Sequence, residues 1–396
     1  MNEVWIVATA AVSALGENRS ELWLKLLAGE SGITHLERFA TTPYYSKIAA
    51  EIKDLQPDPQ HKSRLPTLIK KLFRDFPSPL PTSCTLIGST LKGAIDKQEK
   101  IWRRETTLAE NRQSPKDNPP VPQPTDETTP PPRPCETAGW VAQHFGLIDP
   151  GFTINAACAS STIALNTAAS RIAAGQQDAI LVWAAEIISE FVFAGFASLQ
   201  ALAPEVCRPF DKNRNGLVLG EGAAALLLMS ARRAAKEGYR PLARIKGWGV
   251  ANDAIHLTAP AQDGRGLIKA CRRALNRADL GSEKIAAINA HGTGTIHNDS
   301  METAAFSELF GHRKVPFHSI KGALGHTLGA AGALETVIAV ESLQKQLLPP
   351  TLGLKDPMNE TAGMVSSKIR KFSGDHLLLT NSGFGGVNAA LILAKS

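Results

Sequence analysis

Short runs of apolar, β-prone residues alternate along the chain with longer stretches rich in alanine. Successive positions within the runs are apolar, which is typical of strands buried on both faces, and the stretches between them are long enough to form helices. This alternation predicts a layered α/β fold with buried sheets. The runs form two series of five, at residues 4–12, 84–88, 152–157, 179–185 and 223–229 and at residues 243–250, 285–290, 315–320, 377–379 and 389–393.

Two similar series suggest a duplicated fold, although the residues themselves show no convincing repeat. The 396 residues of the chain are enough for two units of average size or for one large α/β unit. We predict an N-terminal half at residues 1–235 and a C-terminal half at residues 236–396.

One segment interrupts the pattern. Between residues 110 and 134 the sequence is mostly Pro, Asn, Gln, Thr and charged residues, which neither form a regular helix nor contribute to a core. The apolar pattern resumes at Ala138. We therefore interpret the segment as a surface insertion within the first half. A role as a ligand for a proline-binding module stays open.

The amino-acid composition is typical of a globular protein. Apolar residues make up 43% and charged residues 20% of it, which excludes wholesale disorder and a fibrous protein. The formal net charge of +6 is a mild excess, and without a basic stripe interleaved with aromatic residues we expect no nucleic-acid binding. No apolar run approaches the ~18 residues of a membrane span and no basic leader begins the chain, so we expect a cytoplasmic protein.

Cys158 is the candidate nucleophile. It follows an apolar run and precedes a helical stretch, so it is expected at a strand-to-helix turn, where the positive end of the helix dipole lowers the pKa of a thiol and favours the reactive thiolate. Small neighbours leave room for an acyl chain. The odd number of cysteines and the absence of a Cys-x-x-Cys pair argue against a disulfide framework and a zinc site. The others are interpreted as inert: Cys84, Cys135, Cys207 and Cys271.

A nucleophilic cysteine needs an imidazole nearby, and two histidines lie in loops of small residues that follow predicted strands. His291 ends the run at 285–290 and precedes a Gly/Thr loop, and His326 follows the run at 315–320 and leads into a helix. A glycine-rich turn between the last two runs contains Phe384 and Gly385. Its backbone amides can complete an oxyanion hole, and Phe384 can close a pocket.

Together these motifs resemble the elongating β-ketoacyl-acyl carrier protein synthases, members of the thiolase-fold superfamily. The resemblance extends over nearly the whole chain and includes the segments 207–211 and 220–223. It implies a duplicated, five-layered αβαβα fold. It also implies a decarboxylative Claisen condensation, in which an acyl group on Cys158 reacts with a malonyl-carrier thioester to give a 3-oxoacyl product. No metal or redox cofactor is required, because decarboxylation supplies the carbanion. The substrates are carried on the phosphopantetheine of the acyl carrier protein.

The resemblance also implies roles for further residues. The amides of Cys158 and Phe384 stabilise the oxyanion, and His291 and His326 bind the malonyl thioester carbonyl and stabilise the enolate. Lys321 and Glu302 organise the site through an ion pair with Asp299 beside them. The residues lining the phosphopantetheine arm are Thr293 and Thr295.

The sequence departs from the family pattern in three places. Lys321 is followed by Gly322 instead of serine, residues 296–298 read Ile-His-Asn where Pro-x-Gly is usual, and the glycine-rich loop is one residue short. These departures favour a specialised fatty-acid, polyene or polyketide pathway over housekeeping elongation.

The expected partners are an acidic acyl carrier protein and a second ketosynthase-like chain, in a homodimer or in a heterodimer with a chain-length factor. The basic residues at the expected docking position are Lys70, Lys71 and Arg74, although a solvated helix face explains them equally well. Three other functions would each show a different sequence pattern. A chain-length factor lacks the nucleophile, a thiolase normally has a second cysteine near its C-terminus, and a non-catalytic scaffold would present the proline-rich segment.

Overall fold

The computed structural model describes residues 2–110, 133–134 and 137–396. The proline-rich insertion predicted at 110–134 lies outside them except at its ends, as does Cys135. The four described cysteines are free thiols. None of the helices in the described part of the chain is long and apolar enough to cross a membrane.

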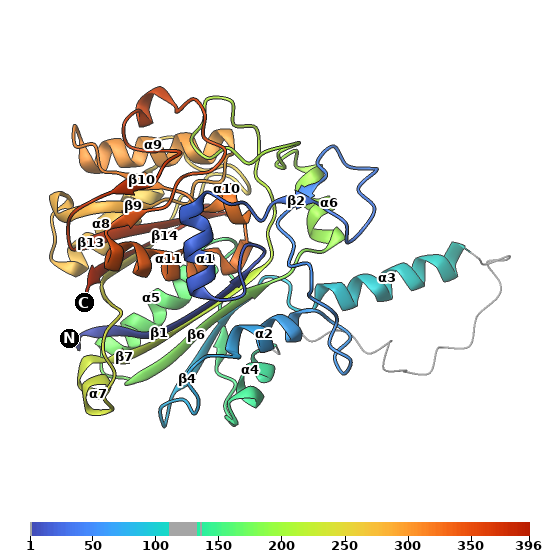
Figure 1. The fold of residues 1–396 in the computed structure, drawn as a ribbon, viewed down its shortest axis with the longest axis horizontal. Helices are drawn as coiled ribbons and strands as arrows, with labels where there is room; N and C mark the ends of the chain where they lie inside the picture. Colours follow the sequence, from blue (N-terminus) through green and yellow to red (C-terminus); the bar gives the residue numbers. More distant parts are fainter. Residues whose placement is uncertain (1, 111–132, 135–136) are drawn as a thin grey trace.

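Ten strands form one sheet, in which each half of the chain contributes five neighbouring strands (Figure 1). Their order is β10-β9-β13-β14-β8-β1-β7-β6-β4-β5. The first half supplies β1 (Val4–Ser13), β4 (Thr85–Ser89), β5 (Phe152–Thr153), β6 (Ala179–Glu186) and β7 (Gly222–Ser230). The second half supplies β8 (Ala243–Asn252), β9 (Ile285–Asn289), β10 (Phe317–His318), β13 (His376–Gly383) and β14 (Val387–Lys395).

The two sets of five strands have the same topology. In each, the first strand pairs antiparallel with the last, the last pairs antiparallel with the fourth, and the fourth is followed by the second and third as parallel neighbours. The sets meet where β1 and β8 pair antiparallel over three residues. The duplication predicted from the two series of runs is confirmed. The boundary at 235/236 lies within α7 (Ala231–Lys236) and stays a prediction.

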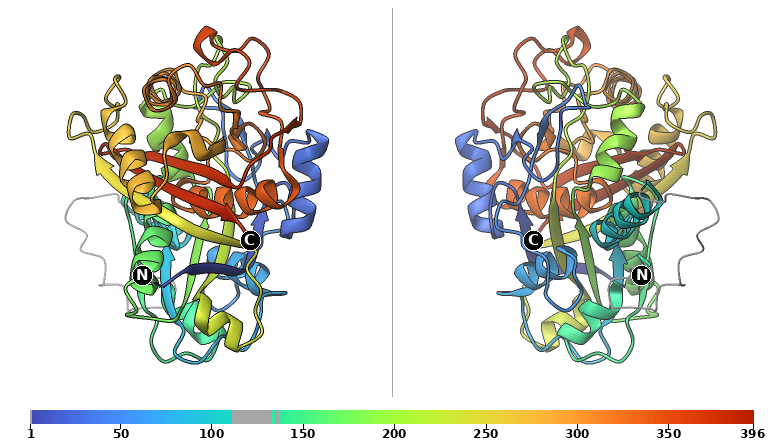
Figure 2. Two further views of the ribbon diagram at one scale, coloured as in Figure 1. Left: turned by 90° about the vertical axis from the view of Figure 1, so that its left-hand side faces the viewer. Right: turned by 90° about the vertical axis from the view of Figure 1, so that its right-hand side faces the viewer.

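Two helices lie between the strands of the two halves. They are α5 (Ser160–Ala173) and α11 (Ala331–Lys345), and each contacts strands of both halves. Other helices cover the outer faces: α2 (Leu65–Phe73) and α4 (Ala138–His144) with α7 on the first half, and α8 (Arg265–Ala278) and α9 (Ile296–Phe310) on the second. The turned views of Figure 2 show the red strands of the second half above the blue and green strands of the first half. The five strands of each half thus form one β layer, with α5 and α11 between the two layers and the other helices outside them. This is the predicted αβαβα layering.

The remaining elements are short or peripheral. The helices are α1 (Arg19–Ala28), α3 (Ile95–Glu110), α6 (Glu190–Ser198), α10 (Lys321–Leu324), η1 (Ser282–Lys284), η2 (Leu328–Ala330) and η3 (Asn359–Thr361). Two small sheets pair β2 (Thr34–His35) with β3 (Ile48–Ala49) and β11 (Leu347–Leu348) with β12 (Arg370–Lys371).

The unbroken apolar runs follow from burial on both faces. All eight residues of β6 and all nine of β7 are buried. Their alternate side chains belong either to a central cluster with α5 and α11 or to an outer cluster with α2 and α4. All ten predicted strands are present, but β5 and β10 are shorter than predicted. After β5 the chain leaves the sheet to form the turn that carries Cys158.

Candidate active site

Cys158 lies in the turn between β5 and α5, as predicted. It stands two residues before the first residue of α5. The preceding Ala157 has a φ of 49°, in the left-handed region that non-glycine residues rarely adopt. The turn directs the thiol into a cavity, which Cys158 lines while being only 7% exposed.

The prediction of a lowered thiol pKa is wrong for this structure. Burial raises the pKa of Cys158 from 9.0 to about 12, and the opposing effect of the Lys321 charge is smaller. That rise corresponds to about 4 kcal/mol against the thiolate, whereas a helix terminus supplies ~0.3–1 kcal/mol in its favour. The resting group is therefore a neutral thiol, which needs a base to accept its proton as it reacts.

His291 follows the end of β9, and its backbone is fixed by a buried carboxylate. The amides of His291 and Gly292 donate to the two carboxylate oxygens of Glu302, at 2.7 and 2.6 Å. Thr380 Oγ1 donates to the same carboxylate at 3.0 Å. Burial raises the pKa of Glu302 to about 7. Glu302 thus holds the histidine loop in place through its backbone.

The hydrogen bonds around His291 define its tautomer. Lys321 Nζ lies 3.3 Å and Asn381 Nδ2 lies 3.1 Å from His291 Nδ1. The Asn381 amide is oriented by its partners, since its Nδ2 donates to the Glu335 carboxylate at 2.7 Å. Because both neighbours of His291 Nδ1 are donors, Nδ1 must accept, and the proton of the neutral ring is on Nε2.

His326 lies beside His291 between α10 and η2. The two ring centroids are 5.2 Å apart at an interplanar angle of 83°. Burial, together with the positive charge of Lys321, lowers the pKa of both imidazoles well below the usual value. Both rings are therefore neutral at pH 7, and each can donate one N–H to a ligand.

Lys321 pairs with Glu335 on α11, and the predicted ion pair with Glu302 is wrong. Lys321 Nζ donates to Glu335 Oε1 and, at 2.5 Å, to the His291 carbonyl oxygen. Both side chains are 2% exposed. Glu302 faces the backbone amides of the histidine loop instead. Lys321 thus connects α11 to His291, and its positive charge adds to the larger effect of burial in keeping the imidazoles neutral.

Asp299 stabilises the loop that follows His291. It accepts hydrogen bonds from the amides of Thr293, at 3.1 Å, and Phe210, at 2.7 Å. It therefore ties the 207–211 motif to the loop. The hydroxyls of Thr293 and Thr295 are 2.8 Å apart.

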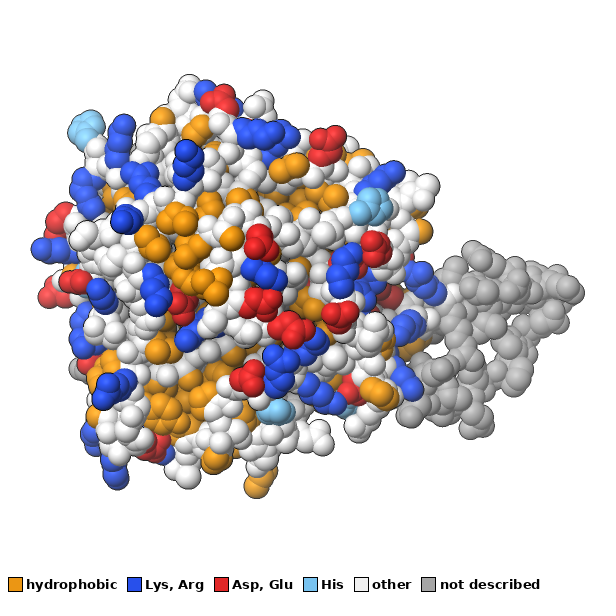
Figure 3. Space-filling model, in the orientation of Figure 1, with side chains coloured by type: hydrophobic (Ala, Val, Ile, Leu, Met, Phe, Trp, Pro, Cys, Tyr) orange, Lys and Arg blue, Asp and Glu red, His pale blue; other side chains and the backbone are white. Residues whose placement is uncertain are grey.

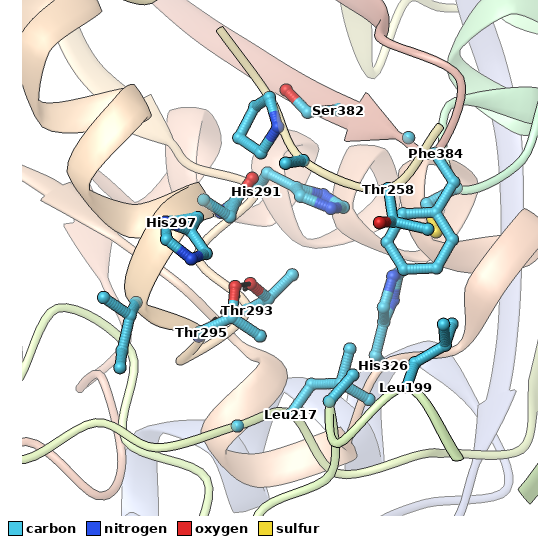
Figure 4. A pocket seen from close by; sticks show the side chains of 18 of the residues that line it. Leu199, Leu217, Thr258, His291, Thr293, Thr295, His297, His326, Ser382 and Phe384 are labelled. Atoms are coloured by element: carbon cyan, nitrogen blue, oxygen red, sulfur yellow. Dashed lines mark hydrogen bonds between the residues drawn. The ribbon is translucent and has the colours of Figure 1, made fainter. Parts of the chain in front are cut away.

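These residues surround one cavity of about 460 Å³, shown in Figure 4. Six predicted site residues line it: Cys158, His291, Thr293, Thr295, His326 and Phe384. Lys321, Glu302 and Asp299 lie behind its wall. Among the lining residues that sequence reasoning missed, Ser382 donates to Asn388 Oδ1 at 2.7 Å, and Asn388 Nδ2 donates to Asp253 at 2.9 Å.

The glycine-rich turn brings Phe384 next to the cysteine. The preceding Gly383 is so close that a Cβ there would lie 3.0 Å from the Cys158 nitrogen. The Phe384 ring stacks on Phe196 with centroids 5.7 Å apart. The amide of Gly385 donates to the Leu257 carbonyl oxygen at 2.7 Å, so it does not serve an oxyanion.

The predicted docking cations lie on or just after α2, and each faces an acid of the same chain. Lys70 pairs with Asp58 at 2.6 Å, and Lys71 and Arg74 pair with Glu17 at 2.7 and 3.5 Å. On the face shown in Figure 3, basic and acidic side chains are likewise intermixed. This local compensation weakens the docking prediction, which stays a prediction.

Two models of one family match the chain. Residues 87–234 match the N-terminal domain and residues 242–355 the C-terminal domain of beta-ketoacyl synthase. The 3-oxoacyl-[acyl-carrier-protein] synthase 2 of Coxiella burnetii is 32% identical over 421 aligned positions, covering 99% of this chain and 98% of that protein. A putative mitochondrial 3-oxoacyl-[acyl-carrier-protein] synthase of Schizosaccharomyces pombe is also 32% identical, covering 100% and 99%.

Solved structures agree with these matches. The ishigamide ketosynthase/chain length factor superimposes with a TM-score of 0.89 at 26% identity, covering 100% of this chain and 99% of that one.

Proposed function

Because the chain belongs to the β-ketoacyl synthase family, whose members are acyltransferases, we propose that it joins an acyl group on Cys158 to a malonyl-carrier thioester. One observation carries the assignment of roles. A thiol and two imidazoles line a single cavity, and burial together with the positive charge of Lys321 behind its wall keeps both imidazoles neutral.

In the first half-reaction, the Cys158 sulfur attacks the thioester carbonyl of an acyl-carrier substrate. Its proton passes to an imidazole and then to the departing carrier thiol, so the resting neutral thiol is consistent with the step. The amides of Cys158 and Phe384 are the proposed donors to the tetrahedral oxyanion. The product is acyl-Cys158 and a free carrier thiol.

In the second half-reaction, the malonyl thioester carbonyl binds between His291 and His326. The bond to the carboxylate breaks, carbon dioxide leaves, and the electron pair moves to the thioester oxygen as an enolate. The N–H groups of the two neutral rings stabilise this developing charge. The enolate carbon attacks the acyl-Cys158 carbonyl, and loss of the cysteine sulfur gives the 3-oxoacyl-carrier product.

The phosphopantetheine arm is proposed to lie against Thr293 and Thr295. Their paired hydroxyls line the same cavity as Cys158 and present polar atoms to a ligand that carries amides. Both substrates reach the cysteine on such an arm, so one binding groove serves both half-reactions. The phosphopantetheine is then part of the carrier protein that delivers each substrate, and the chain needs no bound cofactor of its own.

We further propose a specialised pathway, because the sequence departures reshape the site. A Cβ at position 322 would lie 2.1 Å from the Leu352 carbonyl oxygen, so the usual serine does not fit without a shift of the backbone. The shortened turn places Gly383 against Cys158. Gly322 directly follows Lys321 and Gly383 packs against Cys158, so both changes lie next to predicted site residues.

A panel of acyl donors tests the pathway. Saturated acyl-carrier substrates of several lengths and polyunsaturated or oxidised ones are offered with malonyl-carrier protein, and kcat/KM is measured for 3-oxoacyl product. We expect a preference of about tenfold or more for unsaturated or oxidised donors, equivalent to ~1.4 kcal/mol in the transition state. Equal use of ordinary saturated donors contradicts the specialised role while leaving the ketosynthase assignment intact.

Pairing with a second ketosynthase-like chain is proposed from the free edge of the sheet. The outer edge of β5 has no partner strand among the described residues, and the apolar Phe152 on it is 39% exposed. The adjoining Ile148 is fully exposed. An unpaired apolar edge is a place where another chain adds.

Sedimentation of the chain expressed alone measures this pairing. We expect a particle of twice the chain mass if the partner is a second copy. An insoluble product that becomes soluble on co-expression with a chain-length factor indicates the heterodimer. A stable, active monomer contradicts both forms of pairing.

A further inference from the structure

Two buried polar side chains lie side by side at the ends of β9 and β10, outside the cavity. Asn289 and His318 are register partners on these parallel strands, and they are 0% and 1% exposed. Cross-strand partners project from the same face of a sheet. That face looks toward α11, because Ala287 and Leu379, which lie on the same face, belong to the central cluster.

None of the four polar side-chain atoms of this pair has a hydrogen-bond partner among the described residues. Burial lowers the pKa of His318 to about 3, so its ring is neutral, with one N–H and one accepting nitrogen. The Asn289 amide likewise offers both a donor and an acceptor. The large majority of buried polar groups in folded proteins are hydrogen-bonded, either to protein atoms or to an ordered water that makes about three such contacts.

The pair lies next to the catalytic strand ends. Asn289 precedes His291 by two residues, and His318 precedes Lys321 by three. The segments that follow these two strands are already connected, because Lys321 Nζ donates to the His291 carbonyl oxygen. A second connection, between Asn289 and His318, would fix the distance between the ends of β9 and β10. The contact between His291 and Lys321 depends on that distance.

We propose that Asn289 and His318 bind one buried water between them and act as positioning residues for His291 and Lys321. The proposal rests on the function proposed above, since it concerns the decarboxylating half of the site. Neither side chain touches substrate. Loss of the bridge is therefore expected to slow condensation without weakening binding.

The test compares His318→Leu and Asn289→Leu with His318→Gln, which keeps a donor and an acceptor. We expect each leucine variant to lower kcat for condensation by about tenfold or more, the size of effect seen when a partner that orients a metal-binding side chain is lost. KM for malonyl-carrier protein and the rate of Cys158 acylation should stay at wild-type values. His318→Gln should recover most of kcat.

The sign of the stability change gives an independent readout. Leucine in place of a hydrogen-bonded histidine lowers Tm, whereas leucine in place of an unpaired one raises it. An unchanged kcat, or an unchanged or higher Tm, in His318→Leu overturns the proposal. If the leucine variants do not fold, a high-resolution crystal structure of the wild type decides, because we expect one water within about 3 Å of both side chains. Wild-type protein that acylates but makes no product refutes the proposed function instead.

Discussion

Cys158→Ala is expected to abolish 3-oxoacyl product formation, lowering kcat/KM on the order of 10⁴-fold or more. The thiol is the group that holds the acyl chain, and the described residues around the cavity include no second cysteine to replace it. The change removes one sulfur atom from a buried position, so the fold should survive. Product formation is measured by mass spectrometry of the carrier protein after incubation with both substrates.

The matched control is Cys84→Ala. Cys84 is a buried free thiol whose pKa is also raised to about 12, but it packs in the outer cluster of the first half and does not line the cavity. We expect this variant to keep kcat/KM close to that of the wild type. Substantial product from Cys158→Ala, or equal loss in both variants, would be incompatible with Cys158 as the nucleophile.

Replacing either imidazole is expected to separate the two half-reactions. His291→Ala and His326→Ala each remove an N–H that stabilises the enolate, so condensation should fall by about 10²–10³-fold. Acylation of Cys158 should still occur in each single variant, because backbone amides hold the oxyanion of that step and the remaining imidazole can accept the thiol proton. Single-turnover acylation and steady-state condensation are measured on the same preparations.

His312→Ala serves as the control for the histidine variants. His312 is exposed after the end of α9 and does not line the cavity, so both rates should be unaffected. Equal loss of acylation and condensation in the His291 and His326 variants would assign the imidazoles to thiol activation alone. Unimpaired condensation in either variant would remove that histidine from the mechanism.

Much of the fold was predictable because its signals are local. An apolar run such as that of β6 needs burial on both faces, and two series of such runs correctly predicted a duplicated sheet. The positions of Cys158, His291 and His326 after strands were predictable for the same reason, since each lies in a turn of small residues that follows an apolar run. The ends of β5 and β10 were not predictable, because the apolar runs continue beyond these strands into the turns that lead to Cys158 and Lys321.

The electrostatics of the site depended on tertiary contacts that no local pattern contains. Glu335 lies on α11 among apolar and small residues, and only the packing of that helix brings it to Lys321. The raised pKa of Cys158 is likewise a consequence of burial in the folded protein, which outweighs the helix terminus visible in the sequence. The backbone amide of Gly385 donates to the carbonyl oxygen of Leu257, which lies in a loop distant in the sequence.

The intact mass of the protein after incubation with an acyl-carrier donor alone tests the central claim most directly. Wild-type protein and the His291→Ala variant should each gain the mass of one acyl group, located on Cys158 by peptide mapping, while Cys158→Ala should gain nothing. An adduct of equal yield on Cys158→Ala, or the lack of any adduct on wild-type protein across the whole panel of donors, would contradict an acyl-enzyme formed at this thiol.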